Sequence, residues 1–206
     1  MQMPEPTPEH EWLLQFLGDW TFESECNMGP DQPPLKTTGK QTTRSLGSLW
    51  TLGEMENDSP DGQSMRSVFT LGFDPAKQRF VGTFVASCMT HLWPYDGLLD
   101  ATRNVLTLDS EGPSFAGDGT MAKYQDIVEV IDKDHHLLTS RFQNPDGSWT
   151  QFMSARYTRV ANLREPTMNS TNNTTQQDEA EIRRLLAAWN AAFAAKNAGH
   201  QAGEGW

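Results

Sequence analysis

The sequence predicts a mainly β fold, a closed antiparallel up-and-down barrel of about ten strands with one short helix at its N-terminus. Short segments of alternating or β-rich composition follow one another up to residue 160. Loops rich in glycine, proline and aspartate separate these segments at the spacing that an antiparallel meander needs. No long helical segment interrupts them. Closure into a barrel is expected because an open sheet of this size would leave exposed edges.

The N-terminal segment is expected to cap this barrel. Residues 1–8 contain three prolines and predict an extended arm. A short helix then begins at Pro8. Its apolar residues lie three to four positions apart and share one face: Trp12, Leu13, Phe16 and Leu17. Gly18 ends the helix and Trp20 belongs to the first strand. The helix therefore closes one end of the barrel, and a binding mouth is expected at the other end.

Ten segments are expected to form the strands of the barrel. They are Asp19–Asn27, Lys36–Leu46, Leu49–Glu56, Ser64–Phe73, Arg79–Met89, Leu92–Leu99, Val105–Ser110, Ala122–Ile131, His136–Phe142 and Ser148–Val160.

The composition changes after the barrel domain, which is expected to span residues 9–161. Residues 162–177 are rich in Asn, Thr and Gln and predict a linker. Residues 178–206 begin with a predicted helix that carries an apolar stripe: Ile182, Leu185, Leu186, Trp189 and Phe193. Such a stripe must be buried against something, so a homodimer or docking on a partner is one hypothesis.

The charge and the cysteines restrict the possible partners and the compartment. The net charge is -11 and the isoelectric point is near 4.8. This balance excludes the basic surface that binds nucleic acid or an anionic membrane. The two cysteines are too few for a disulfide framework, and no secretion signal is recognisable. A cytoplasmic, acidic, soluble protein is expected.

Several motifs give the chain a family resemblance. They are Leu17–Trp20, Thr70–Pro75, Met89–Trp93 with Gly97, Asp146–Trp149 and Tyr157–Arg159. With these motifs, residues 10–160 resemble the bacterial domain-of-unknown-function family numbered fifteen seventy-nine. The resemblance implies a calycin-like barrel, related in shape to lipocalins and fatty-acid-binding proteins, whose interiors hold small apolar molecules. It implies a fold and no established activity.

The C-terminal helix has a resemblance of its own. Residues 178–193 are similar to the opening helix of SnoaL-like domains, the cone-shaped α+β fold of the nuclear-transport-factor-two superfamily. Lys196–His200 departs from the pattern of that fold. The segment therefore resembles a truncated SnoaL-like domain, and no pocket or acid/base residue is carried over from it.

Eight residues are candidates for contact with a ligand. A turn centred on Pro60 would place Glu54 opposite Arg66, either as a pair that orients the polar head of a ligand or as an exposed ion pair between strands. The other candidates are aromatic, sulfur-containing or imidazole side chains, which line an apolar cavity or fill a ligand-free core: Trp50, Met65, Met89, His91, Trp93 and Met153. His91 has no partner at ligand spacing, and the pair His135–His136 is expected to be exposed beside a turn.

No pattern indicates catalysis. Nucleotide-binding glycine motifs and the Gly-x-Ser-x-Gly motif are absent. Catalytic residues, metal ligands and a cofactor are therefore not expected. The leading hypothesis is a barrel that binds a small apolar or amphipathic molecule. A small enzyme that acts on a lipid-like or polyketide-like substrate is the alternative, which only the SnoaL-like helix suggests.

Overall fold

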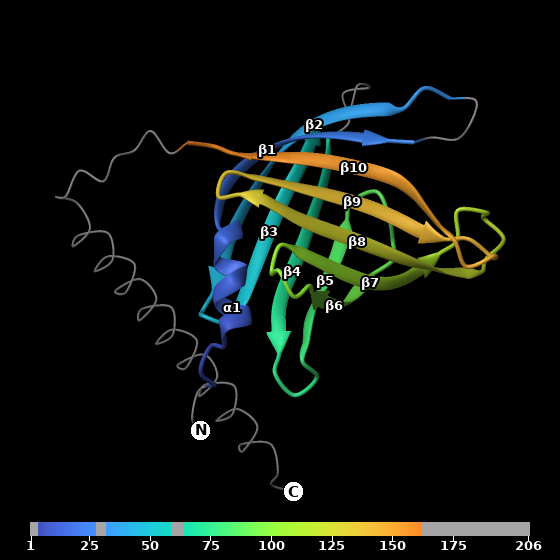
Figure 1. Ribbon diagram of the computed structural model, residues 1–206. Coiled ribbons are helices and arrows are strands. Elements are labelled where there is room, and N and C mark those ends of the chain that lie inside the picture. The colour runs from blue at the N-terminus through green and yellow to red at the C-terminus, as the bar shows by residue number, and fades with distance from the viewer. Residues whose placement is uncertain (1–3, 28–31, 59–63, 162–206) are drawn as a thin grey trace, which may run out of the picture. The chain divides into compact units, whose positions relative to one another are not determined.

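The protein forms a closed barrel of ten antiparallel strands, seen in Figure 1. The computed structural model describes residues 4–27, 32–58 and 64–161. The strands are β1 (Gly18–Cys26), β2 (Leu35–Leu46), β3 (Trp50–Asp58), β4 (Met65–Asp74), β5 (Arg79–Ala86), β6 (Trp93–Leu99), β7 (Val105–Pro113), β8 (Met121–Asp132), β9 (His135–Gln143) and β10 (Trp149–Arg159). Each strand pairs with the next along the chain, and β1 pairs with β10. The predicted fold class and the strands of the meander are confirmed.

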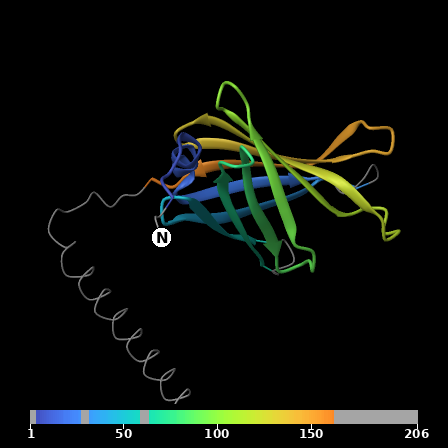
Figure 2. The same ribbon diagram turned by 90° about the horizontal axis from the view of Figure 1, so that it is seen from below.

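A short helical plug lies at the end of the barrel where β1 begins and β10 ends (Figures 1 and 2). It consists of α1 (Pro8–Leu13) and the 3-10 turn η1 (Leu14–Phe16). The backbone N–H of Thr7 donates to Nδ1 of His10 at 3.0 Å and so stabilises the first turn. Gly18 follows with a φ of +106°, a conformation that glycine adopts without strain. The chain reverses there and enters β1.

Arg159 at the end of β10 fixes this plug to the barrel. Its guanidinium donates to the carbonyl oxygens of Leu17 and Gln15, both at 2.6 Å. The same group lies 4.0 Å from the ring centre of Trp20, and Trp20 Nε1 donates to the carbonyl of Phe16 at 2.9 Å. Trp20 is 2% exposed, so it belongs to the closed base of the barrel and not to a mouth.

The buried apolar residues form two separate clusters on different walls. One consists of Leu13 from α1 together with residues of β4, β5 and β7: Leu71, Phe73, Phe80, Leu106 and Leu108. The other consists of Trp20 and Phe22 from β1 with Ala155 and Tyr157 from β10. A single domain usually has one contiguous core. Aromatic contacts of the plug connect the two clusters, from Trp12 through Phe16 and His136 to Trp20.

The remaining expectations about organisation lie outside the described residues. These are the linker 162–177 and the helix 178–206 with its SnoaL-like pattern and apolar stripe. The barrel and its plug form one compact unit, Met1–Val160. None of the described helices is long and apolar enough to cross a membrane.

Candidate functional site

Asp126 on β8 projects a carboxyl group into the barrel. Its register partner on β7 is Leu108, a member of the buried core, and its partner on β9 is the buried Ser140. Register partners share one face of a sheet, so Asp126 lies on the inner face. Charged side chains are rarely placed in such a position unless they have a function or a partner.

Two neutral hydroxyl groups hold this carboxyl group. The hydroxyl of Tyr95 on β6 donates to Oδ2 of Asp126 at 2.6 Å, and the hydroxyl of Ser140 donates to Oδ1. Burial raises the pKa of Asp126, while the hydrogen bonds from Ser140 and Tyr95 act in the opposite direction. Burial, followed by the nearby charge of Asp126, also raises the pKa of Tyr95 well above its usual value. The three side chains form a polar centre, Tyr95–Asp126–Ser140.

The polar centre is only partly covered by neighbouring side chains. Asp126 and Tyr95 face the interior of the barrel, and the surrounding protein does not cover either side chain completely. Other side chains of the inner face are also only half buried: Ser24, Met55, Phe69, Phe84, Leu138 and Met153. Most of them are apolar.

Tyr157 and His136 form the wall between the polar centre and the plug. Their rings stack, with centres 4.4 Å apart and planes at 11°. Burial, and then the charge of Arg159, lowers the pKa of His136 to about 3, so this imidazole is neutral at physiological pH. Its Nδ1 is buried without a hydrogen-bond partner. The hydroxyl of Tyr157 donates to the sulfur of Met55 across the barrel at 3.6 Å.

Aromatic side chains gather toward the end of the barrel opposite the plug. Phe115, in the loop between β7 and β8, is 65% exposed and lies edge-on against Tyr124, Phe142 and Phe152. Tyr124 in turn contacts the indole of Trp93 at 4.9 Å between ring centres. Tyr124 and Asp126 lie two residues apart on β8 and therefore share the inner face. This aromatic cluster borders the route from that end to the polar centre.

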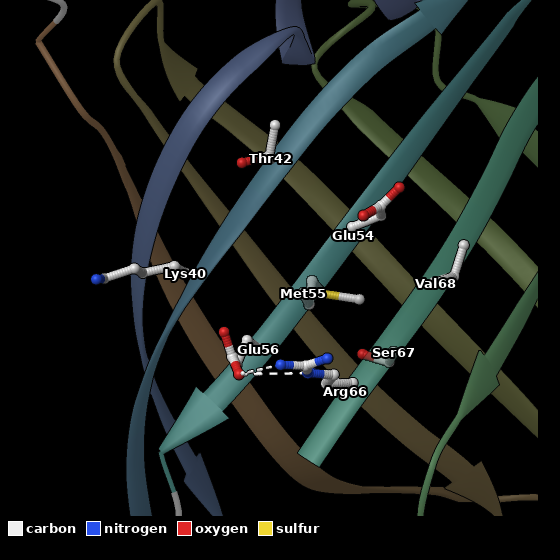
Figure 3. A pocket seen from close by; sticks show the side chains of 8 residues that line it. All are labelled: Lys40, Thr42, Glu54, Met55, Glu56, Arg66, Ser67 and Val68. Atoms are coloured by element: carbon white, nitrogen blue, oxygen red, sulfur yellow. Dashed lines mark hydrogen bonds and ion pairs between the residues drawn. The ribbon is translucent and has the colours of Figure 1, made fainter. Parts of the chain in front are cut away.

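The outer face of β2, β3 and β4 carries a separate open groove of about 370 Å³ (Figure 3). Arg66 pairs there with Glu56 at 3.2 Å, as the dashed lines in Figure 3 show. The register places Val68 opposite Glu54, and Glu54 instead pairs with Arg44 at 3.7 Å. The expected pair of Glu54 and Arg66 is therefore wrong, because the turn between β3 and β4 sets a register shifted by two residues.

The candidates Trp50, Glu54 and Arg66 all lie on the outer face. Thr51 is buried, and Trp50 precedes it on β3, so the indole points outward, where it covers Gly72. The side chains of Glu54 and Arg66 are 64% and 76% exposed. These positions correct the expectation that Trp50 lines the interior and that the two charged groups orient a ligand there.

The other candidates lie at the end opposite the plug or on the inner wall. Trp93 Nε1 donates to the sulfur of Met89 at 3.0 Å, and Met65 contacts the thiol of the exposed Cys88 at 3.1 Å. His91 Nε2 lies 3.0 Å from the carbonyl oxygen of Glu111, the arrangement of an ordinary hydrogen-bonded histidine.

Met153 is the register partner of Ser140 and faces the polar centre from β10. His136 corrects a further expectation. It was expected to be exposed, but it is 5% exposed because its side chain points inward from the start of β9.

The residues of the polar centre are absent from the candidates that the sequence suggested. A signal for Asp126 exists, because it occupies the same phase of β8 as Tyr124 and Val128, where an apolar residue is expected. Tyr95 and Ser140 have no comparable signal. Their role depends on how the neighbouring strands β6 to β9 pair in the sheet, which brings side chains of β6, β8 and β9 together.

Within residues 4–27, 32–58 and 64–161, no three His, Cys, Asp or Glu side chains are grouped so that they could hold a metal ion. The groups that the interior offers are a carboxyl group, hydroxyl groups and aromatic rings. This combination binds and orients a ligand by hydrogen bonds and apolar contact.

Comparison with solved structures supports the barrel fold. The chain is similar to Rv2717c from M. tuberculosis, with a TM-score of 0.55 and 13% identity over 76% of this chain and 99% of that one. It is also similar to the S-type phycobiliprotein lyase CPES from Guillardia theta, with a TM-score of 0.51 and 10% identity over 75% of this chain and 93% of that one. Identities this low establish the fold alone.

No curated protein matches the chain significantly in sequence. The profile of one family matches residues 5–159, nearly the whole barrel and its plug. The chain therefore belongs to the family described as "Protein of unknown function (DUF1579)".

Proposed function

We propose that this protein binds a small amphipathic molecule inside its barrel, with the polar part of the ligand at Asp126. The observation that carries the proposal is the Tyr95–Asp126–Ser140 centre, an inward-facing carboxyl group that two hydroxyl groups hold and that keeps some accessible surface. A carboxyl group costs stability when it is removed from water. Its position in an otherwise largely apolar wall is understandable if a ligand group completes its hydrogen bonds.

The walls suit the apolar part of such a ligand. Met55, Phe69, Phe84 and Met153 face the interior and keep accessible surface. Methionine and aromatic side chains adapt to apolar ligands of differing shape. Met65, Met89, His91 and Trp93 contribute nearer the end opposite the plug, and the aromatic cluster around Phe115 borders the entry route.

The alternatives from the sequence stay predictions. A contribution of the C-terminal helix to dimerisation, and an enzymatic role connected with it, depend on residues 178–206, which lie outside the described part of the chain. Ligand binding in the barrel needs neither of them.

A fluorescent probe tests the proposal. Nile red is neutral and becomes strongly emissive in an apolar cavity, so the full-length protein is expected to bind it saturably. Met153→Trp places a larger side chain into the interior and is expected to weaken binding about tenfold or more. Ser154→Trp adds the same side chain at the next position, on the outer face, and serves as the matched control.

Two outcomes oppose the proposal. Absence of saturable binding by the wild-type protein would contradict a hollow interior. Equal affinities of the Met153→Trp and Ser154→Trp variants, with both folded by circular dichroism, would place the probe on the outside of the barrel.

A further inference from the structure

Asp126 is an ionisable carboxyl group on the inner face of the barrel, and no described cation pairs with it. None of the ion pairs among the described residues includes Asp126, and no cation contributes to its pKa. His136 shares the interior, but burial keeps it neutral. Within the described part of the chain, the carboxyl group accepts hydrogen bonds from the neutral hydroxyl groups of Tyr95 and Ser140.

Arg159, a cation on the same face, is engaged elsewhere. It lies two residues after Tyr157, at the closed end, where it donates to the carbonyl oxygens of Gln15, Leu17 and Lys133 and pairs with Asp134 at 3.5 Å. Its donors are occupied by the plug and by the turn between β8 and β9. Among the described residues, no cation pairs with Asp126 and could hold the carboxylate of a fatty acid there, and a second carboxylate beside Asp126 would be repelled.

The free lone pairs of the Asp126 carboxyl group determine which ligand group can bind it. Each oxygen accepts one hydrogen bond from a neutral hydroxyl, and a carboxylate has room for further donors at both oxygens. A cationic N–H group supplies both a positive charge beside the carboxylate and a further hydrogen-bond donor to its oxygens. Such charge-assisted hydrogen bonds are stronger than neutral ones. Desolvation of such a buried pair is costly, and burial of an apolar body on the same ligand contributes free energy that offsets this cost.

The route to the polar centre favours the same chemistry. The rings of Trp93, Tyr124 and Phe115 lie at the end opposite the plug, and aromatic faces attract organic cations. The net charge of -11 raises the local concentration of cations near the protein.

From these observations we infer that the ligand of the barrel is a protonated amine with an apolar body, and that its nitrogen binds Asp126. This inference rests on the proposed function and names the chemical class of its ligand. Tyr95 and Ser140 act as positioning residues that hold the carboxylate in place on the inner face.

Three ligands with the same alkyl chain test the inference. Decylamine, decanol and decanoate are used to displace Nile red from the full-length protein at pH 7.5. Decylamine is charged there like a lysine side chain, and it is expected to bind about tenfold or more tightly than decanol, with decanoate weakest. Asp126→Asn is nearly isosteric and is expected to remove this preference while decanol binds as before. Asp109→Asn, at an exposed position of the neighbouring strand β7, is expected to change nothing.

The outcomes separate the inference from the proposed function. If the three ligands bind the wild-type protein equally, or decanoate binds most tightly, the inference is overturned and the barrel remains a binder of apolar molecules. If the preference for decylamine survives in Asp126→Asn, the inference is also overturned. If neither Nile red nor any of the alkyl ligands binds the wild-type protein, the proposed function itself fails.

Discussion

His136 shows how strongly the barrel interior acts on one residue. Its imidazole is stacked on Tyr157, contacts Trp20 edge-on at 4.5 Å between ring centres and has a buried, unsatisfied Nδ1. Its pKa is lowered from 6.5 to about 3. Unfolding returns the group to water, so below its ordinary pKa the unfolded chain binds a proton that the folded chain does not.

The sign of the resulting pH dependence follows from this difference. The contribution of His136 to stability is fully present above pH 6.5 and is lost as the pH falls toward about 3. The expected loss is about 1.4 kcal/mol of unfolding free energy per pH unit within that window. His136→Phe keeps the ring stack and removes the titrating group. As the pH falls, the unfolding free energy of this variant is expected to decrease less steeply than that of the wild type, by about 1.4 kcal/mol per pH unit. Urea unfolding at several values from about pH 4 to about pH 7 measures both slopes.

A neighbouring histidine provides the control. His135 is half exposed and lies 2.9 Å from Asp132, so His135→Phe is expected to keep the steep slope of the wild type. Identical slopes for the wild type and His136→Phe would show that His136 does not titrate with a lowered pKa.

Residue patterns identified less of the site than of the fold. Asp126 occupies a phase of β8 that otherwise carries apolar residues, and the sequence gives this single signal. The pairing of Glu54 with Arg66 was predicted from a turn centred on Pro60. The observed turn between β3 and β4 is centred one residue later, and this difference shifts every pair of facing residues on the two strands by two positions. The indole of Trp50 points outward because side chains alternate along β3, and nothing in its neighbourhood of the sequence distinguishes the two faces.

At the scale of elements, the prediction was more complete. Turn residues and alternating strands are local signals, so the strands of the meander were all predicted within a few residues. The plug was also predicted, from the spacing of Trp12, Leu13 and Phe16. The contacts that join the plug to the barrel were not predicted, since Arg159 lies 144 residues after Gln15 and 142 residues after Leu17.

Arg159 is expected to carry much of the attachment of the plug. Arg159→Ala removes charge-assisted hydrogen bonds to two carbonyl groups and the contact with Trp20, so the unfolding free energy is expected to fall by about 3 kcal/mol. Arg156→Ala, three residues earlier and exposed, is expected to change it by less than about 0.5 kcal/mol. Chemical denaturation measures both values. An Arg159→Ala variant as stable as Arg156→Ala would show that Arg159 does not stabilise the attachment of the plug.

At the scale of the whole molecule, the pairing of neighbouring strands in the barrel assembles the candidate site. The hydrogen bond between Tyr95 and Asp126 joins β6 to β8 across β7, and Ser140 adds β9. The two core clusters lie on different walls, and several inward-facing side chains elsewhere in the barrel are only half buried. The sequence predicts the barrel, but the space inside it depends on how side chains from ten strands meet.

A crystal structure of the full-length protein with a bromine-labelled decylamine tests the central claim most directly. Anomalous scattering locates the bromine, and the account predicts that it lies inside the barrel between Met153 and Phe84. The amine nitrogen is expected within hydrogen-bond distance, about 2.7 to 3.0 Å, of the Asp126 carboxylate. A ligand found only in the outer groove beside Glu56 and Arg66, or an interior filled by side chains, would contradict the account.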